Sequence, residues 1–180
     1  MGKSSRHRHP RLAVLVLFAL GLSGGMVFAC DSLTVVPLAS RLEFGNLRMP
    51  DGASGWLAVD PRGAVASSGA VNFSSSGRPS PAEIELQGSP GQRYLLELTH
   101  DSGANAERAA AVLGRLSVAI DGQPVAERGN AFQLTLPRPA QGARAVVRLS
   151  IGGDLQIRRF TSPLVVHAGI RLRCLASGIP

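Results

Sequence analysis

The most regular feature of the chain is an alternation of hydrophobic and polar side chains, which is typical of strands with one buried face. Residues 82–87 place Glu83 and Glu85 on the polar face, and residues 93–98 place Tyr94 on the apolar face. Between the two runs stands Gly88-Ser89-Pro90-Gly91, in which glycine and proline favour a turn. The pattern predicts a β-hairpin, and because an isolated hairpin is marginal in water, it also predicts further strands.

The remainder of the chain repeats this pattern with short strands and Gly/Pro turns. Strands are expected at 32–38, 42–47, 56–59, 64–73, 115–120, 129–136, 143–151, 155–160 and 164–174. Turns are expected at 60–63, 121–122 and 152–154, and 106–113 fit either a short helix or an irregular loop. A spacing near ten residues predicts an all-β fold, a single antiparallel β-sandwich of pilin-like or Ig-like Greek-key type.

The first residues have the pattern of an export signal. Residues 1–11 are basic, 12–20 are apolar, and small residues precede Ala29. This pattern predicts an N-terminal signal helix over residues 1–29, cleavage after Ala29, and a single domain over 30–180. Two alternatives are a retained membrane anchor over 12–29 and a lipoprotein that carries its lipid on Cys30.

Most of the positive charge lies in that signal. The formal net charge of the whole chain is +7, and removal of residues 1–29 leaves 15 arginines against 12 acidic residues. The remaining arginines are scattered, and aromatic residues make up only 4% of the chain. A nucleic-acid site needs clustered cations and stacking aromatics, so no nucleic-acid partner is expected. Membrane contact is expected only through the signal or the alternative lipid.

The two cysteines, Cys30 and Cys174, lie near the two ends of the predicted domain. In an exported chain such a pair favours a disulfide, which requires Cα atoms within about 7 Å. The first and last strands are therefore expected to be neighbours or to face each other. Two separate thiols remain the alternative.

No arrangement of residues predicts a reaction, so no catalytic residues, cofactor or metal are expected and the chain is interpreted as not an enzyme. His100-Asp101-Ser102 contains the residue types of a catalytic triad, but adjacent residues in a turn cannot form that relay. Glu83 and Glu85 are interpreted as a solvated strand face. Trp56 and Tyr94 are the residues expected to line a ligand pocket, if one exists.

Several short motifs of strands and turns occur along the chain, at 42–45, 59–63, 68–71, 81–84, 88–91 with Tyr94 and Leu96, and 151–155. In this order they resemble a family of small exported bacterial proteins known as a domain of unknown function, related in pattern to fimbrial subunits and spore-coat U-type domains. The resemblance implies an exported pilin-like β-sandwich with no established activity. Unlike such proteins, which commonly end in a strand with a final tyrosine, this chain has a last strand that finishes at Cys174.

We therefore expect a non-catalytic structural or adhesive protein of the bacterial cell envelope, such as a minor fimbria-associated subunit, with other envelope or fimbrial proteins as partners. The expected location is periplasmic, secreted or at the cell surface. The alternative is a periplasmic or surface-anchored binding module for a small ligand or glycan. Donor-strand polymerisation needs a free N-terminal extension, and a bond from Cys30 to Cys174 would hold that segment in place.

Overall fold

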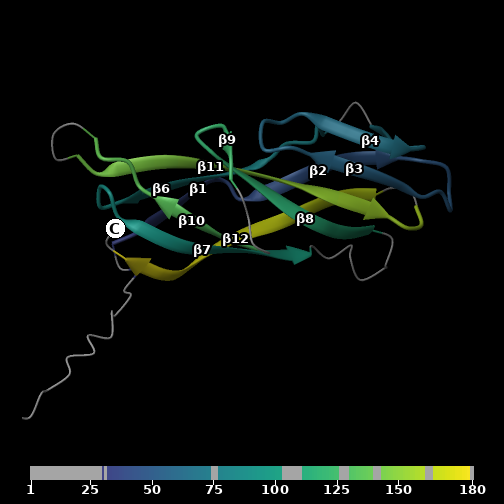
Figure 1. Cartoon of the computed structure of the whole chain (residues 1–180). Coiled ribbons are helices and arrows are strands. Elements are labelled where there is room, and N and C mark those ends of the chain that lie inside the picture. Colours follow the sequence, from purple (N-terminus) through teal and green to yellow (C-terminus); the bar gives the residue numbers. More distant parts are fainter. Residues whose placement is uncertain are drawn as a thin grey trace, which may run out of the picture.

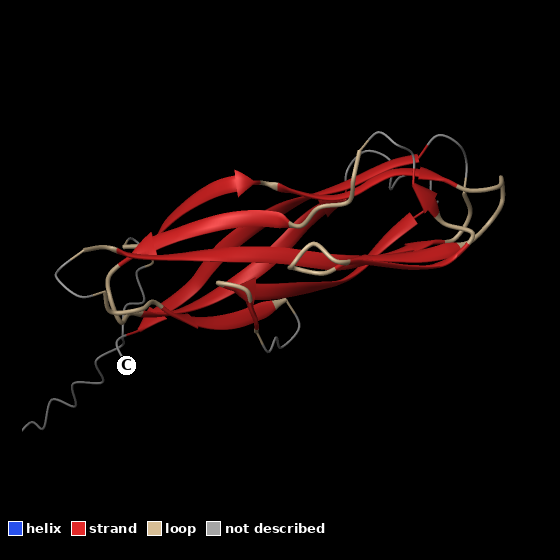
Figure 2. Ribbon diagram, turned by 90° about the horizontal axis from the view of Figure 1, so that it is seen from above, coloured by secondary structure: helices blue, strands red, loops and turns tan. Residues whose placement is uncertain are grey.

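The computed structural model describes residues 30, 32–73, 77–102, 111–125, 130–139, 143–160 and 164–178. Within these ranges the chain forms strands and no helix, and the strands belong to two antiparallel sheets. Figures 1 and 2 show the resulting elongated body, in which strands run along the long axis. The prediction of an all-β antiparallel sandwich is confirmed.

The larger sheet has seven strands. They are β1 (Thr34–Ala39), β3 (Gly55–Val59), β4 (Val65–Gly69), β6 (Ala82–Gly88), β8 (Ala111–Ile120), β9 (Gln123–Pro124) and β11 (Ala145–Ile157). The long β11 organises this sheet, because it pairs with β6 along its first half, with β3 along its second half and with β8 on its other edge. β1 adds to β6, β4 adds to β3, and β9 adds to β8.

The smaller sheet has five strands in the order β10-β7-β12-β2-β5. They are β2 (Arg41–Arg48), β5 (Asn72–Phe73), β7 (Arg93–Ser102), β10 (Ala131–Thr135) and β12 (Leu164–Gly178). β12, yellow in Figure 1, lies in the middle and pairs with β2 and β7.

The core lies between the two sheets and is filled mostly by aliphatic side chains. Alternate residues of β6, β7 and β11 point into it, as the sequence pattern predicts. Its largest fully buried side chains are Tyr94, Phe44 and Phe160. Each large apolar side chain buried in this way contributes about 1.5–3 kcal/mol.

The predicted hairpin of residues 82–98 is wrong in its pairing. β6 and β7 are strands, but β6 belongs to the larger sheet and β7 to the smaller one. The segment Gly88-Ser89-Pro90-Gly91 therefore carries the chain from one sheet to the other. A Cβ on Gly88 would lie 2.7 Å from Leu136 Cδ1 and 2.9 Å from the Tyr94 hydroxyl, so a larger residue here would force these two side chains to shift.

The predicted turn at Gly152-Gly153-Asp154 is also wrong, because β11 runs without interruption through these residues. The glycines instead allow close packing. A Cβ on Gly152 would clash with the backbone of Val59, Asp60 and Pro61, where the chain leaves β3 and crosses the outer face of β11. The turns at 60–63 and 121–122 are confirmed, the first by a 2.9 Å bond from Gly63 N to Asp60 O.

The predicted disulfide is confirmed. Cys30 and Cys174 are bonded, with their Cα atoms 6.0 Å apart. Cys30 precedes β1 of the larger sheet and Cys174 lies in β12 of the smaller sheet, so the bond joins the two layers.

The predicted signal helix over 1–29 and its cleavage after Ala29 lie outside the described residues, so the predicted domain boundary at residue 30 stays a prediction. Residues 106–113 were expected to form a short helix or a loop. Residues 106–110 lie outside the described part of the chain, and Ala111 is the first residue of β8. No described segment forms a helix long and apolar enough to cross a membrane.

Candidate functional site

The two aromatic residues predicted to line a pocket are not brought together. Tyr94 is fully buried between the sheets on β7. Trp56 lies on β3 of the other sheet, where its neighbour Leu57 is buried and Trp56 itself is partly exposed. Because successive strand residues point to opposite faces, Trp56 lies on the outer face of the larger sheet. The two side chains are therefore on opposite sides of that sheet.

Tyr94 has a structural contact at one end of the sandwich. Its hydroxyl lies 3.0 Å from the hydroxyl of Ser32, and Ser32 Oγ is also 3.5 Å from Gln92 Oε1. The tyrosine ring thus fills the core while its hydroxyl is satisfied by the chain just after Cys30. This is the usual arrangement for a buried tyrosine.

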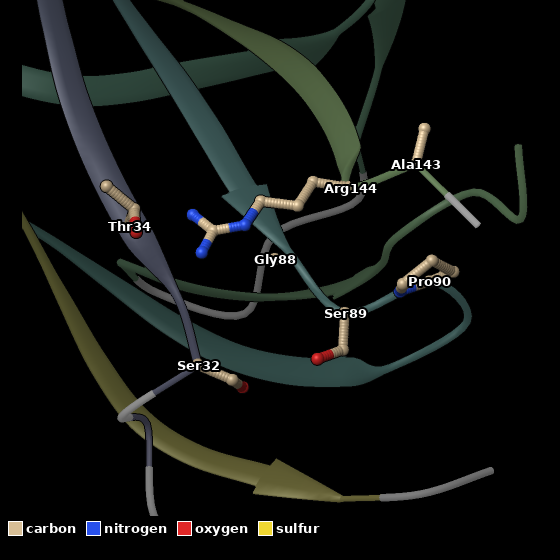
Figure 3. Close-up of a pocket in the computed structure, with 7 residues that line it drawn as sticks. All are labelled: Ser32, Thr34, Gly88, Ser89, Pro90, Ala143 and Arg144. Carbon is tan, nitrogen blue, oxygen red and sulfur yellow. The ribbon is translucent and has the colours of Figure 1, made fainter.

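A shallow pocket of about 260 Å³ lies beside Ser32. Figure 3 shows Arg144 extending over Gly88 toward Thr34, with the side chains of Ser32 and Ser89 below it. Among the lining residues only Gly88 is buried. The arginine and hydroxyls are therefore already hydrated, which leaves little gain for a ligand that would replace that water.

Trp56 occupies a different setting on the outer face. It pairs with Gln156 of β11 on one side and with Ser68 of β4 on the other. Directly opposite residues on adjacent strands have Cβ atoms about 4.5–5.5 Å apart and share one face. The indole is thus flanked by an amide and a hydroxyl, both of which are exposed.

One row further along the same face, Asp154 pairs with Ala58. These two residues belong to the lining of a groove of about 320 Å³, together with Arg115, Ser117 and Pro61. Gly114 lies beneath Asp154, because a Cβ at that position would clash with the carboxylate. The glycine lets this acidic side chain lie flat over the sheet.

Two turns that flank this groove are held together by one arginine. Arg62 donates from Nη2 and Nε to the carbonyl oxygen of Gly122, at 3.1 and 3.3 Å. Asp60 closes the first turn, since its Oδ1 accepts bonds of 2.8 Å from the backbone N–H groups of Arg62 and Ala64. The β3–β4 and β8–β9 turns are therefore fixed relative to each other.

A third pocket, of about 410 Å³, includes His167, Asp101 and Arg171 among its lining residues. Arg171 donates to Asp101 at 3.1 Å, but their side chains are 74% and 54% exposed. An ion pair this exposed contributes about 0–1 kcal/mol. The pocket therefore contains a solvated ion pair at the protein surface.

The triad-like segment His100-Asp101-Ser102 is part of β7 and is not the predicted turn. Because successive residues of a strand point to opposite faces, the three side chains do not face one another. Asp101 instead accepts a hydrogen bond from Arg171. Glu83 and Glu85 lie on the outer face of β6, opposite Ser150 and Arg148 of β11. Among the described residues, no group of three His, Cys, Asp or Glu side chains could hold a metal ion.

The edge strand β4 is a further surface feature, visible at the margin of the body in Figure 1. All of its residues are exposed, and it pairs with β3 on one side only within the described part of the chain. In an antiparallel pair of strands, hydrogen-bonded and non-hydrogen-bonded residue pairs alternate. Asp60 N donates to Ala64 O at 2.8 Å, so the pairs 58/66 and 56/68 are hydrogen-bonded as well. Val65 and Ser67 belong to the intervening pairs, and their N–H and C=O groups therefore point away from β3.

The sequence did not identify Asp154 and Gln156 as neighbours of Trp56. The predicted turn at 152–154 placed Asp154 in that turn and Gln156 in a separate strand after it. The signal was present nonetheless, because hydrophobic residues occupy every second position from Ala145 to Ile157 with the single exception of Gly153. An uninterrupted strand would have placed both side chains on the outer face.

Comparisons with known proteins identify a family and little else. A model of the family described as a domain of unknown function (DUF4402) matches residues 33–163. No curated protein matches. One solved structure, a GH31 alpha-xylosidase from Xanthomonas citri, is 11% identical with a TM-score of 0.23, over 79% of this chain and 20% of that enzyme. A likeness this weak carries no argument about fold or function.

Proposed function

The chain belongs to the family described as a domain of unknown function (DUF4402), and we propose that it is an exported, non-catalytic structural or adhesive protein of the bacterial cell envelope, of the kind that resembles minor fimbrial subunits. In this role it would contact other envelope proteins through a sheet edge. The disulfide between Cys30 and Cys174 is consistent with an oxidising compartment outside the cytoplasm.

The observation that carries the proposal is the open edge of β4. An edge strand offers unpaired N–H and C=O groups to another extended chain, and proteins usually protect such edges with charged residues or proline. β4 has the sequence VASSG, with neither. Its five exposed residues therefore suit the addition of a strand from a partner.

The edge strand β1 differs from β4 in two ways. It contains Pro37, which cannot donate to a ladder, and its register with β6 shifts between Pro37 and Ala39. Only residues 31–33 separate it from Cys30, which is disulfide-bonded to Cys174 in β12. β1 is thus held in its own sheet, which supports a protein that receives a strand at β4 over one that donates β1 to a neighbour.

The test places a photo-crosslinking amino acid at Ser67, on the open edge, in the full-length protein expressed in its own bacterium. Irradiation is expected to give discrete adducts with envelope proteins or with a second copy. The matched control places the same group at Arg148, which is exposed on β11 in the interior of the larger sheet.

Adducts from Ser67 and none from Arg148 would support strand addition at β4. Equal adducts from both positions would show unspecific collisions. Absence of the protein from the periplasmic, envelope and secreted fractions would contradict the proposal outright.

A further inference from the structure

We propose that the outer face of the larger sheet around Trp56 binds neutral saccharides. This inference rests on the proposed adhesive function for its biological setting and adds to it a ligand class. The binding surface consists of Trp56, Gln156, Ser68, Asp154 and the adjoining groove with Arg115 and Ser117.

The first argument is the position of the indole. Trp56 is the only tryptophan in the chain, and it lies on the outer face instead of joining the core beside Leu57 and Val59. A partly exposed indole offers a broad apolar face and an N–H donor. The C–H face of a pyranose ring stacks on such a surface, while its hydroxyl groups stay available for hydrogen bonds.

The second argument is the set of polar groups beside the indole. Gln156 lies directly opposite Trp56, and Asp154 lies two residues away on the same strand and face, at roughly 7 Å. A carboxamide offers two donors and an acceptor, and a carboxylate accepts through two oxygens. Neighbouring sugar hydroxyls both donate and accept, so this combination suits them.

The third argument is the space next to the indole. The row beside Trp56 carries Ala58 and Ala66, whose side chains are too short to fill the surface. The groove of about 320 Å³ begins at Ala58 and extends to Ser117 and Pro61. Its volume is at the lower end of the range of small-molecule sites, about 300–1,000 Å³.

The fourth argument is charge. The groove contains Arg115 as its cation and Asp154 and Asp60 as its acids, and Asp60 is already used by two backbone N–H groups of its own turn. These charges give an anionic ligand no net electrostatic attraction. A neutral polyhydroxyl ligand does not depend on such attraction.

The test uses the single tryptophan as its own reporter. Lactose, cellobiose and N,N′-diacetylchitobiose are titrated into the purified, disulfide-bonded protein, and Trp56 fluorescence is followed. At least one of the three is expected to give a saturable change. Isothermal calorimetry with the same sugar supplies the affinity for variants that lack the indole.

Three variants examine the surface. Trp56→Ala and Gln156→Ala should each lower the association constant at least about tenfold, the equivalent of one hydrogen bond or stacking contact. Gly114→Ala should weaken binding although Gly114 is not itself a lining residue, because the new methyl group displaces the carboxylate of Asp154, which is one. The matched control is Gln133→Ala, an exposed glutamine on β10 of the other sheet, which should bind like the wild type.

No saturable change with any of the three sugars, or an equal loss in Gln133→Ala and Gln156→Ala, would overturn the inference. Thermal midpoints of all variants separate loss of binding from loss of folding. Because the titration uses purified protein, it gives its answer independently of the envelope cross-linking. Sugar binding without cross-linking at Ser67 would uphold this surface and contradict only the role of β4.

Discussion

Cys30 and Cys174 form a disulfide across 144 residues of sequence, and the bond connects the segment before β1 to the middle strand of the opposite sheet. A single covalent link thus ties the edge of one layer to the centre of the other. Because almost the whole folded domain lies between the two cysteines, the link restricts the unfolded chain strongly.

We expect Cys174→Ser to lower the free energy of unfolding by up to about 5 kcal/mol, the value that chain entropy assigns to a loop of this length. Urea unfolding of the wild type and the variant measures the difference. Cys30→Ser should give the same loss, and the double variant no more than either single one. Reductant should destabilise the wild type alone, and a reductant effect on the double variant would contradict this explanation.

Most of the strands were predictable from the sequence, whereas their pairing partners were not. Alternation in residues 82–87 and 93–98 correctly gives which side chains are buried, as Ile84 and Tyr94 show. The alternation does not indicate which other strand each strand pairs with. A short Gly-Pro segment can close a hairpin or carry the chain to the other sheet, and the choice depends on long-range contacts of β6 with β11 and of β7 with β12.

Gly152 is expected to tolerate no side chain. Gly152→Ala would push a methyl group into the backbone at Val59, Asp60 and Pro61, which cannot move aside as a flexible side chain would. Such overpacking typically costs about 1–3 kcal/mol, to be measured by chemical unfolding. Ser150→Ala, two residues earlier on the same face of β11, should change stability by less than about 0.5 kcal/mol. Equal losses in both would contradict the close approach.

The candidate binding surface was only half predictable. Trp56 stood out because it is the sole tryptophan, whereas its neighbours Gln156 and Ser68 are distant in sequence and meet only through strand pairing. Tyr94 stood out for the same reason of rarity, yet the structure uses it in the core. Residue type alone does not distinguish an aromatic that packs from one that is presented to solvent.

Tyr94→Phe tests the contact between the core and the segment after Cys30. The ring stays in place, but its 3.0 Å hydrogen bond to Ser32 is lost, and we expect a loss of about 1 kcal/mol in unfolding free energy. Ser32→Ala should cost a similar amount. In a double-mutant cycle the two losses should not add, and full additivity would show that the hydroxyls do not interact.

Proline substitutions in β4 test which backbone groups face the open edge, on which the proposed strand addition depends. Ser68 pairs with Trp56 in a hydrogen-bonded position, so Ser68→Pro removes a bond to β3 and should cost on the order of 1–3 kcal/mol in stability. At Ser67 the N–H points away from β3, and Ser67→Pro should therefore stay within about 0.5 kcal/mol of the wild type, since proline is tolerated on an outer edge.

The same Ser67→Pro variant should lose its partner in pull-downs from envelope extracts, whereas Ser67→Ala, which keeps the N–H, should retain it. If Ser67→Pro were the less stable of the two proline variants, the N–H group of Ser67 would be the one bonded to β3. The N–H and C=O groups that face the open edge would then belong to Ala66 and Ser68.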